Sequence, residues 1–439
     1  MRKELETASV AVPEAQQPYR IPDNWRWATL GAINRYCPHT IDPATQPDAH
    51  FELYSVPSVE IDYPEIIPGS EIGSTKQAVQ KNDILLCKIN PRINRVWKVS
   101  KHTDYQLLAS SEWIVIRNSQ MNPDFMLYYF RSPMFREFML SHVAGVGGSL
   151  MRAQSKYVKQ YPVPLPPLAE QQRIVDRIES LFTKLDAAQD KAREVIESLF
   201  FIRQAYLYHA FMGKLTQIWR VQRQIGFPWK NETLQSVCSM KITDGTHQTP
   251  TYCKENQGIP FLSAKDVTSG KICWDGIKYI TPELHKELYA RLAPQIDDIL
   301  LAKNGTTGVG AIVDVEKVFD LYVTLAVLRP NKEVILPRYL LNVVNSPICK
   351  KQFDEHLTGI GLPNLHLRDI RKVTIPLPSL EEQAEIVRIV DDLTEKSQSV
   401  QTAAEQVIKH IDIMKKAILG RAFRGELGTN DPSEASPDI

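Results

Sequence analysis

The chain has 439 residues, of which 43% are hydrophobic and 23% charged, and its formal net charge is +1. This length allows two or three domains with their own cores, and the balanced charge argues against a protein that coats nucleic acid through bulk positive charge. Because no apolar run is long enough to cross a membrane and the start lacks a signal-peptide core, we expect no membrane association and a cytoplasmic location. The six scattered cysteines predict neither a zinc site nor a disulfide framework.

The first part of the chain reads as a short arm followed by a globular segment. We predict a flexible arm at 1–20 and a domain at 21–163 that opens with the Trp-containing turn DNWRWATLG. Inside it lie an Asp-Ile-Leu-Leu strand at 83–86 and an aromatic-rich helical stretch that runs into Ser132-Pro133. A glycine-bearing loop, VAGVGGSL, then leads to the next segment.

Residues 164–216 are predicted to form a long helix, which begins with the phrase PLPPLAEQQRIVDRI. Prolines 166 and 167 block helix before it, and Gly213 marks its end. Its apolar and small residues are spaced by four and three in alternation, which is typical of a coiled-coil seam. The seam positions are Ile174, Ile178, Leu181, Leu185, Ala188, Ala192, Val195, Leu199, Ile202 and Tyr206.

The second half of the chain repeats this layout. A domain at 217–375 opens with FPWKNETLQ and contains an Asp-Ile-Leu-Leu strand at 298–301, Ser346-Pro347 and the loop LTGIGLPN. A second helix at 376–427 begins with PLPSLEEQAEIVRIV, offset by 212 residues from the first phrase. Both helices end in Ala-Phe-x-Gly-x-Leu, so a structural unit has been duplicated. The tail at 428–439 is acidic and is predicted to be disordered.

The fold class that follows is α+β, with two similar globular domains separated by two long helices and an internal pseudo-two-fold repeat. The second seam comprises Ile386, Val390, Leu393, Ser397, Val400, Ala404, Val407, Ile411, Met414 and Ile418. Each helix of about 45 residues is a rod of roughly 65–70 Å. We expect the two helices to pack antiparallel as a coiled coil; the alternative is that each serves a separate partner or a homodimer. Divergent domains on a rod of fixed length suit a protein that reads two separated patches of duplex DNA.

Taken together, the paired helix starts, the terminal Ala-Phe-x-Gly-x-Leu, the Trp-containing openings and KITDGTHQTP at 241–250 resemble specificity subunits of type I restriction-modification systems. The resemblance covers essentially the whole chain and implies two target-recognition domains, each reading half of a bipartite, asymmetric site in double-stranded DNA. It implies spacer helices that set the gap and bind two modification (methyltransferase) subunits, with restriction subunits joining later. It also implies a chain without catalysis, where S-adenosylmethionine, ATP and Mg belong to partner subunits. One departure is that the first domain has RYCPHT at 35–40 instead of a clear DGTHQTP.

Candidate DNA contacts are long donors in loops, because such side chains reach both base edges and phosphates. The first set follows the Asp-Ile-Leu-Leu strands: Lys88, Asn90, Arg92, Asn94, Arg95, Lys303, Asn304, Thr306 and Thr307. A polar hairpin is the alternative. Further candidates are Thr246 and His247, in a predicted tight turn capped by Asp244, and Arg152 and His366, in loops that also hold Ser149, Lys156, Asn364 and Arg368. A structural turn and simple anchoring of the helices are the alternatives for these.

The repeated Glu-Gln at each helix start has two interpretations. Glu170, Gln171, Glu382 and Gln383 either cap the helix N-terminus or dock a partner subunit. Asn122-Pro123-Asp124-Phe125 comes nearest to an amino-methyltransferase loop, but Asp stands where a second proline is needed, so methyl transfer by this chain is not expected. A coiled-coil adaptor that binds only proteins remains the competing function. Salt dependence of duplex binding separates the two, since phosphate contacts weaken steeply with salt.

Overall fold

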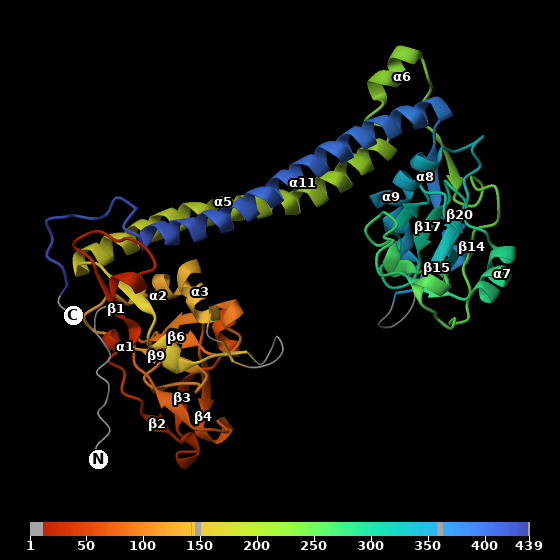
Figure 1. The fold of residues 1–439 in the computed structure, drawn as a ribbon. Coiled ribbons are helices and arrows are strands. Elements are labelled where there is room, and N and C mark those ends of the chain that lie inside the picture. Colours follow the sequence, from red (N-terminus) through yellow and green to blue (C-terminus); the bar gives the residue numbers. More distant parts are fainter. Residues whose placement is uncertain (1–11, 142, 145–150, 358–362, 438–439) are drawn as a thin grey trace. The chain divides into compact units, whose positions relative to one another are not determined.

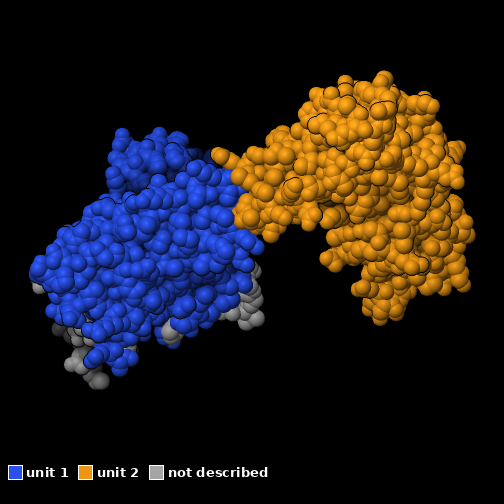
Figure 2. All heavy atoms as spheres, turned by 90° about the horizontal axis from the view of Figure 1, so that it is seen from above, with its two compact units in different colours: residues 1–192, 406–439 blue, residues 193–405 orange. Residues whose placement is uncertain are grey.

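The computed structural model describes residues 12–141, 143–144, 151–357 and 363–437 (Figure 1). The chain forms two compact units, shown in different colours in Figure 2: unit 1 comprises 1–192 and 406–439, and unit 2 comprises 193–405. Each unit therefore holds one globular domain and one half of each long helix, α5 (Leu168–Phe211) and α11 (Leu380–Ala422). The predicted α+β class and the internal repeat are confirmed.

The domain of unit 1 is built on two larger sheets and two strand pairs, the smaller of which is β10 with β11. One sheet has the strand order β2-β5-β8-β3-β4 and the other the order β7-β6-β9, while β1 pairs with β12. The strands are β1 Arg26–Thr29, β2 Thr40–Ile41, β3 His50–Tyr54, β4 Glu65–Pro68, β5 Lys76–Ala78, β6 Ile84–Cys87, β7 Val96–Lys98, β8 Gln106–Ala109, β9 Trp113–Ile116, β10 Val143–Ala144, β11 Arg152–Ala153 and β12 Pro162–Leu165. The helices are α1 Leu30–Ile33, α2 Pro123–Arg131, α3 Pro133–Ser141 and α4 Ser155–Val158.

The domain of unit 2 uses the same scheme with different sheets. Their strand orders are β14-β20-β17-β18 and β16-β15-β19, while β13 pairs with β21. The strands are β13 Lys230–Thr233, β14 Thr243–Asp244, β15 Ile259–Leu262, β16 Lys278–Ile280, β17 Ile299–Ala302, β18 Gly310–Ile312, β19 Asp320–Leu321, β20 Leu325–Leu328 and β21 Thr374–Leu377. The helices are α6 Gln217–Arg223, α7 Pro282–Arg291, α8 Pro337–Val344, α9 Pro347–Glu355 and α10 Leu367–Ile370.

The limits of the long helices match the prediction. Helix α5 has 44 residues and α11 has 43, and each begins within two residues of a proline that cannot continue a helix backwards. Gly213 and Gly425 follow their ends with φ of 72° and 75°, the left-handed conformation that closes a helix. Within each unit the two halves are antiparallel. In unit 2, for example, Tyr206 bonds Thr394 while Thr216, further along, bonds Glu382.

The predicted seam is right at most positions, since fourteen of its twenty residues are buried or partly buried. Ala192 and Ala404 are buried as expected, but Val195 and Val407 are 41% and 44% exposed. Other exposed seam predictions are Ala188, Ile202, Val400 and Met414, whereas the residues one position later, Gln189, Ile196, Gln401 and Ile408, are partly buried. A straight helix drifts about 20° per heptad from a strict 3.5-residue repeat, which amounts to about one residue over five heptads. The contact line follows this drift.

The C-terminal tail differs from its prediction of disorder. Over its described residues it packs on unit 1: Arg173 forms a two-pronged ion pair with Glu434 at 2.8 Å and also donates to the carbonyl of Thr429. The amide of Asn24 donates to the carbonyl of Asp431. Of the predicted N-terminal arm, 12–20 are described and include a short 3-10 turn at Glu14–Gln16.

Two features are absent from the residues that the structure describes. None of the helices found there is long and apolar enough to span a membrane. Within the same ranges, no group of three or more His, Cys, Asp or Glu side chains is arranged to hold a metal ion.

Candidate nucleic-acid interface

The start of α11 is fastened to the domain of unit 2 through the buried carboxylate of Glu382. It accepts hydrogen bonds from the guanidinium of Arg220 at 2.6 Å, the hydroxyl of Thr216 at 2.7 Å and the indole N–H of Trp229 at 2.9 Å. Arg220 also stacks over the rings of Phe227 and Trp229. The Trp-containing opening and the helix-start phrase, which recur together in the sequence, are therefore two halves of one contact.

Unit 1 repeats this contact with a different set of hydrogen-bond donors. Glu170 is buried and accepts from the indole N–H of Trp25 at 3.0 Å and from the Thr429 hydroxyl at 3.3 Å. No cation within the described ranges forms an ion pair with it, and burial raises the pKa of Glu170 above its ordinary value. The tail thus stands where α6 stands in unit 2.

The glutamines beside these acids face inward as well. Gln171 accepts from the backbone N–H of Asn122, and Gln383 accepts from that of Leu336, each just before a domain helix. Together with Glu170 and Glu382 they are almost fully buried. In this structure the polar atoms of these side chains are engaged by the chain's own domains. Partner docking and helix capping, the two roles expected from the sequence, both stay predictions.

The Asp-Ile-Leu-Leu strands are held by a second repeated contact. Asp83 lies just before β6 and receives two hydrogen bonds from Arg117, at 2.7 and 2.6 Å. Asp298 lies just before β17 and receives two from Arg329, at 2.8 and 2.7 Å. Two-pronged pairs of this kind fix orientation as well as adding energy. Each anchors the start of the strand whose other end leads into the loop with the candidate DNA contacts.

Each of those loops contains two residues in the left-handed backbone conformation. Asn90 and Asn94 adopt left-handed conformations in the loop after β6, and Gly305 and Gly308 do so in the loop after β17. Asparagine and glycine are the residues that tolerate this conformation. Asn90 and Asn94, which are predicted DNA contacts, therefore also have a structural role. The side-chain amide of Asn94, for example, donates to the carbonyl of Phe130.

A second loop pairs with each of these loops. Ile89 forms an antiparallel bridge with Arg152, and Asn304 forms one with Asn364. The sequence candidates before the long helices are thus brought beside the candidates after the strands. Ser149 lies outside the described residues. Exposed side chains at this edge are Arg92, Arg152, Thr306, His366 and Arg368; Lys88 and Asn304 are partly buried.

Two candidates of the second loop are buried. Lys303 is 7% exposed and its ammonium lies 3.2 Å from Asp244, so it balances a buried carboxylate and does not reach out to a phosphate in this structure. Thr307 is also 7% exposed. Neither side chain faces solvent in this structure, and direct contact with DNA stays a prediction for both.

The KITDGTHQTP segment is packed against a neighbouring strand. A Cβ on Gly245 would lie 1.9 Å from the carbonyl oxygen of Leu321, so only glycine fits there. Asp244 does not cap its own turn as predicted; it faces Lys303 and His247. His247 is exposed and its Nε2 lies 3.2 Å from that carboxylate, while Thr246 is half-buried in a bridge to Tyr322.

The segment that takes its place in unit 1 is built differently. Thr40 begins β2, which pairs with β5, whereas β14 pairs with β20. The entry loops of the two domains therefore differ in structure, as the sequences suggested.

Two other features bear on the candidates. Asn122 caps α2 by accepting from the N–H groups of Asp124 and Phe125, which accounts for its motif without methyl transfer. Arg95 and Arg152, both sequence candidates, are paired with Glu60 and Glu112 at 2.9 Å. The sequence analysis did not predict that Arg117, Arg329, Trp25 and Trp229 hold buried acids of the same chain. The available signal was that each of these residue types occurs in both halves of the chain together with the acid that it binds.

Comparison with known proteins identifies the family. The model described as "Type I restriction modification DNA specificity domain" matches residues 54–198 and 228–410, one match for each domain and the helix that follows it. The chain therefore belongs to this family of DNA specificity proteins. It is 24% identical over 339 residues to the EcoBI specificity subunit of Escherichia coli, covering 74% of this chain and 70% of that protein.

Other relatives cover more of the chain. The MjaVIII specificity subunit of Methanocaldococcus jannaschii is 24% identical over 413 residues, covering 89% of this chain and 92% of its own length. Among solved structures, a chain from work on complex assembly and conformational transition of the type I R-M system has a TM-score of 0.73 at 23% identity, covering 93% of this chain and all of that one. The HsdS subunit from Thermoanaerobacter tengcongensis has a TM-score of 0.57 at 22% identity, with 94% and 100% covered. These likenesses show the fold.

Proposed function

We propose that each unit reads one half of a bipartite, asymmetric site in double-stranded DNA, within the DNA-specificity function that defines the family. The observation that carries the proposal is the repeated loop pair, 88–95 with 152 and 303–309 with 364, held on the same buried framework. The framework is shared while the exposed side chains differ, so the two halves of the site should differ too. Base edges are read by such side chains, while the framework fixes their positions.

We further propose that the long helices bind two modification subunits and set the gap between the half-sites, with restriction subunits joining the complex. Exposed apolar side chains support the docking role, because such patches mark interaction surfaces. They include Phe201 and Ile202 on α5, and Ile413 and Met414 on α11. Specificity subunits as a family are not catalytic, and the same is proposed for this chain. S-adenosylmethionine, ATP and Mg then belong to the partners.

The experiment is single-molecule methylome sequencing of a host that carries the chain with its neighbouring methyltransferase, against the same host without the chain. A new gapped, asymmetric methylated motif is expected. In unit 2, His247→Ala with Thr306→Ala should relax one half of the motif only, and Arg92→Ala in unit 1 should relax the other. An inverted palindrome, or no motif while both proteins are soluble, contradicts the proposal.

The competing protein-only adaptor is not supported by the family assignment. An adaptor would also show no steep loss of duplex affinity with salt, because it makes no phosphate contacts.

A further inference from the structure

Each unit contains a recess at the same place in the repeated framework. In unit 1 it lies between the loop after β6, the first turns of α3 and the outer surface of α11, and has a volume of about 610 Å³. In unit 2 it lies between the loop after β17, α9 and the outer surface of α5, with about 270 Å³. The wall residues correspond: Asn94 with Gly308, Arg136 with Lys350, and Lys416 with Gln204.

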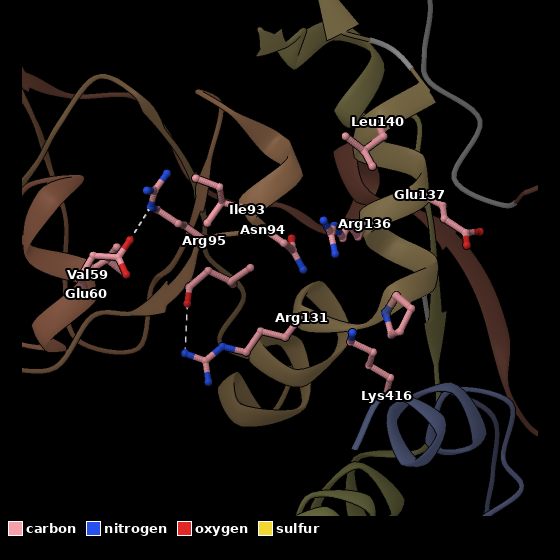
Figure 3. Close-up of a pocket in the computed structure, with 12 residues that line it drawn as sticks. Val59, Glu60, Ile93, Asn94, Arg95, Arg131, Arg136, Glu137, Leu140 and Lys416 are labelled. Carbon is pink, nitrogen blue, oxygen red and sulfur yellow. Dashed lines mark hydrogen bonds and ion pairs between the residues drawn. The ribbon is translucent and has the colours of Figure 1, made fainter. Parts of the chain in front are cut away.

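The recess of unit 1 is rich in cations (Figure 3). Arg95, Arg131, Arg136 and Lys416 line it, against the acids Glu60 and Glu137. Glu60 forms an ion pair with Arg95, and Figure 3 shows Glu137 turned away from Arg136. Within the described ranges no carboxylate forms an ion pair with Arg131, Arg136 or Lys416, although the charges of Asp62 and Asp124 act on Arg131, and cations outnumber acids among the lining residues.

The positive charge at this place has an energetic cost. Arg131 donates to the carbonyl of Val96 at 3.1 Å, and Arg136 donates to that of Arg92, which orients both guanidinium groups at the rim. The protein atoms around Arg131 displace water and lower its pKa. A group held charged in such a setting gains most from an anion brought in from outside.

The recess of unit 2 keeps the cationic character with other residues. Arg203 and Lys350 line it, and no acid is among its lining residues. Lys350 has its own helix partner in Asp354, while Arg203 has no ion pair with the described carboxylates. Thr268, Ser269 and Asn345 add polar groups to the wall.

We propose that these twin recesses are phosphate-binding sites for the backbone of duplex DNA, in which Arg131, Arg136 and Lys416 of unit 1 and Arg203 and Lys350 of unit 2 hold the strand beside the base-reading loops. The proposal rests on the proposed function and goes beyond it by assigning the sequence-independent part of binding to side chains on helices. Arginine suits the task because its fork of donors matches the oxygens of a phosphate.

The position of the site, beside the loop that carries the candidate base contacts, favours DNA over an acidic segment of a partner protein. Phosphate contacts position a protein on the duplex and carry no base information. A chain whose two domains read different bases can therefore use the same phosphate site twice. The recess walls also include Ile93, Asn94 and Arg95, which belong to the loop that carries the candidate base contacts.

The test measures duplex binding by the complex of the chain with its methyltransferase, over a series of salt concentrations. Two pairs of exposed cations are replaced, Arg136→Gln with Lys416→Gln in unit 1 and Arg203→Gln with Lys350→Gln in unit 2. Each pair should lower the slope of log affinity against log salt by about 2, since each phosphate contact contributes about 0.9. Affinity at about 0.1 M salt should fall roughly tenfold or more, equally on a duplex with the methylated motif and on one without it.

The control is Lys184→Gln with Lys191→Gln, two exposed lysines of α5 that line neither recess, which should leave the slope unchanged. The methylated motif itself should not change in the recess variants. An unchanged slope overturns the proposal. So does weaker assembly with the methyltransferase in the absence of DNA, which would assign the recesses to an acidic protein segment. Absence of any motif with the unaltered chain would instead reject the proposed function.

Discussion

At the scale of single residues, two glutamates in equivalent positions are stabilised in different ways. Glu382 has a buried guanidinium beside it, whereas Glu170 has only neutral hydrogen-bond donors within the described ranges. A buried carboxylate is costly unless it is paired or hydrogen-bonded. The duplicated helix starts should therefore respond differently to mutation and to pH.

Removing Arg220 is expected to destabilise unit 2 strongly. Arg220→Met leaves Glu382 charged and buried without its cation, which should cost about 3–5 kcal/mol. Adding Glu382→Gln should recover part of that loss, because the buried charge is then gone. Urea unfolding of the wild type, both single variants and the double variant gives the interaction free energy between Arg220 and Glu382. Additive effects would show that the pair does not act as a unit.

The pH dependence of Glu170 has the opposite sign from that of a salt-bridged acid. Burial raises its pKa above the ordinary glutamate value of 4.5, so between 4.5 and the raised pKa the folded state binds more protons than the unfolded state. Folding stability should therefore fall as pH rises through this window. Glu170→Gln should remove this fall. Melting curves of both proteins from pH 4.5 to 8 test it.

Glu434 acts in a separate pH range. Its ion pair with Arg173 lowers its pKa below 4.5, so its contribution is present above 4.5 and is lost as pH falls further. A wild type and a Glu170→Gln variant with parallel curves above pH 4.5 would contradict the assignment to Glu170.

Sequence reasoning singled out loops that the structure brings together in each domain, but it did not find the internal contacts of every residue within them. Arg92, His247 and Thr306 are exposed as a DNA contact requires. Lys303 could not be recognised as buried, because its partner Asp244 is 59 residues away in the sequence and only the strand pairing of β14, β20 and β17 brings them together. The hydrogen bonds of Trp25 and Trp229 to the helix-start glutamates could not be predicted for the same reason, since they depend on long-range packing.

At the scale of the elements, the long helices show what a heptad pattern can and cannot predict. Their ends follow from local chemistry, a proline before and a glycine after, and were predictable. Their contact line depends on how far the helices supercoil, which no single position encodes. Val407 and Ile411 were both assigned to the seam, yet Val407 is exposed and Ile411 is buried.

This difference gives a matched pair of variants on one helix. Val407→Asn should change the free energy of unfolding by about 0.5 kcal/mol or less, as expected of a surface site. Ile411→Asn should cost about 2–4 kcal/mol, because it removes a buried side chain and buries an amide. Chemical denaturation measures both. Equal losses of unfolding free energy in the two variants would show that Val407 and Ile411 both lie in the helix contact, as the strict heptad pattern predicts.

At the scale of the whole molecule, the duplication was predictable because it lies in the sequence itself, and the α+β class followed from it. The sheets inside the domains were not predictable in detail. The five-stranded sheet of unit 1 and the four-stranded sheet of unit 2 are built from short strands whose partners lie far apart in the chain, as with β3 and β8. Short strands of this kind carry a weak local signal.

The proposed gap-setting role of the helices predicts the effect of an insertion. Four extra residues, about one helical turn, in both α5 and α11 should lengthen the gap between the methylated half-sites and leave both half-sites unchanged. Methylome sequencing of a host carrying the insertion variant with its methyltransferase reads both quantities. A changed half-site would show that the helices contribute to base reading.

The strand pairs at the entrance of each domain have a consequence for inheritance. β1 lies against β12, and β13 lies against β21, so each domain enters and leaves its framework at adjoining points. The contacts that fasten it there, Trp25 to Glu170 and Trp229 to Glu382, are the same in both halves. A gene exchange with crossovers in these repeated phrases would therefore import a foreign domain that already makes the strand pair and the Trp–Glu contact. A lineage could in this way change one half of its target at a time.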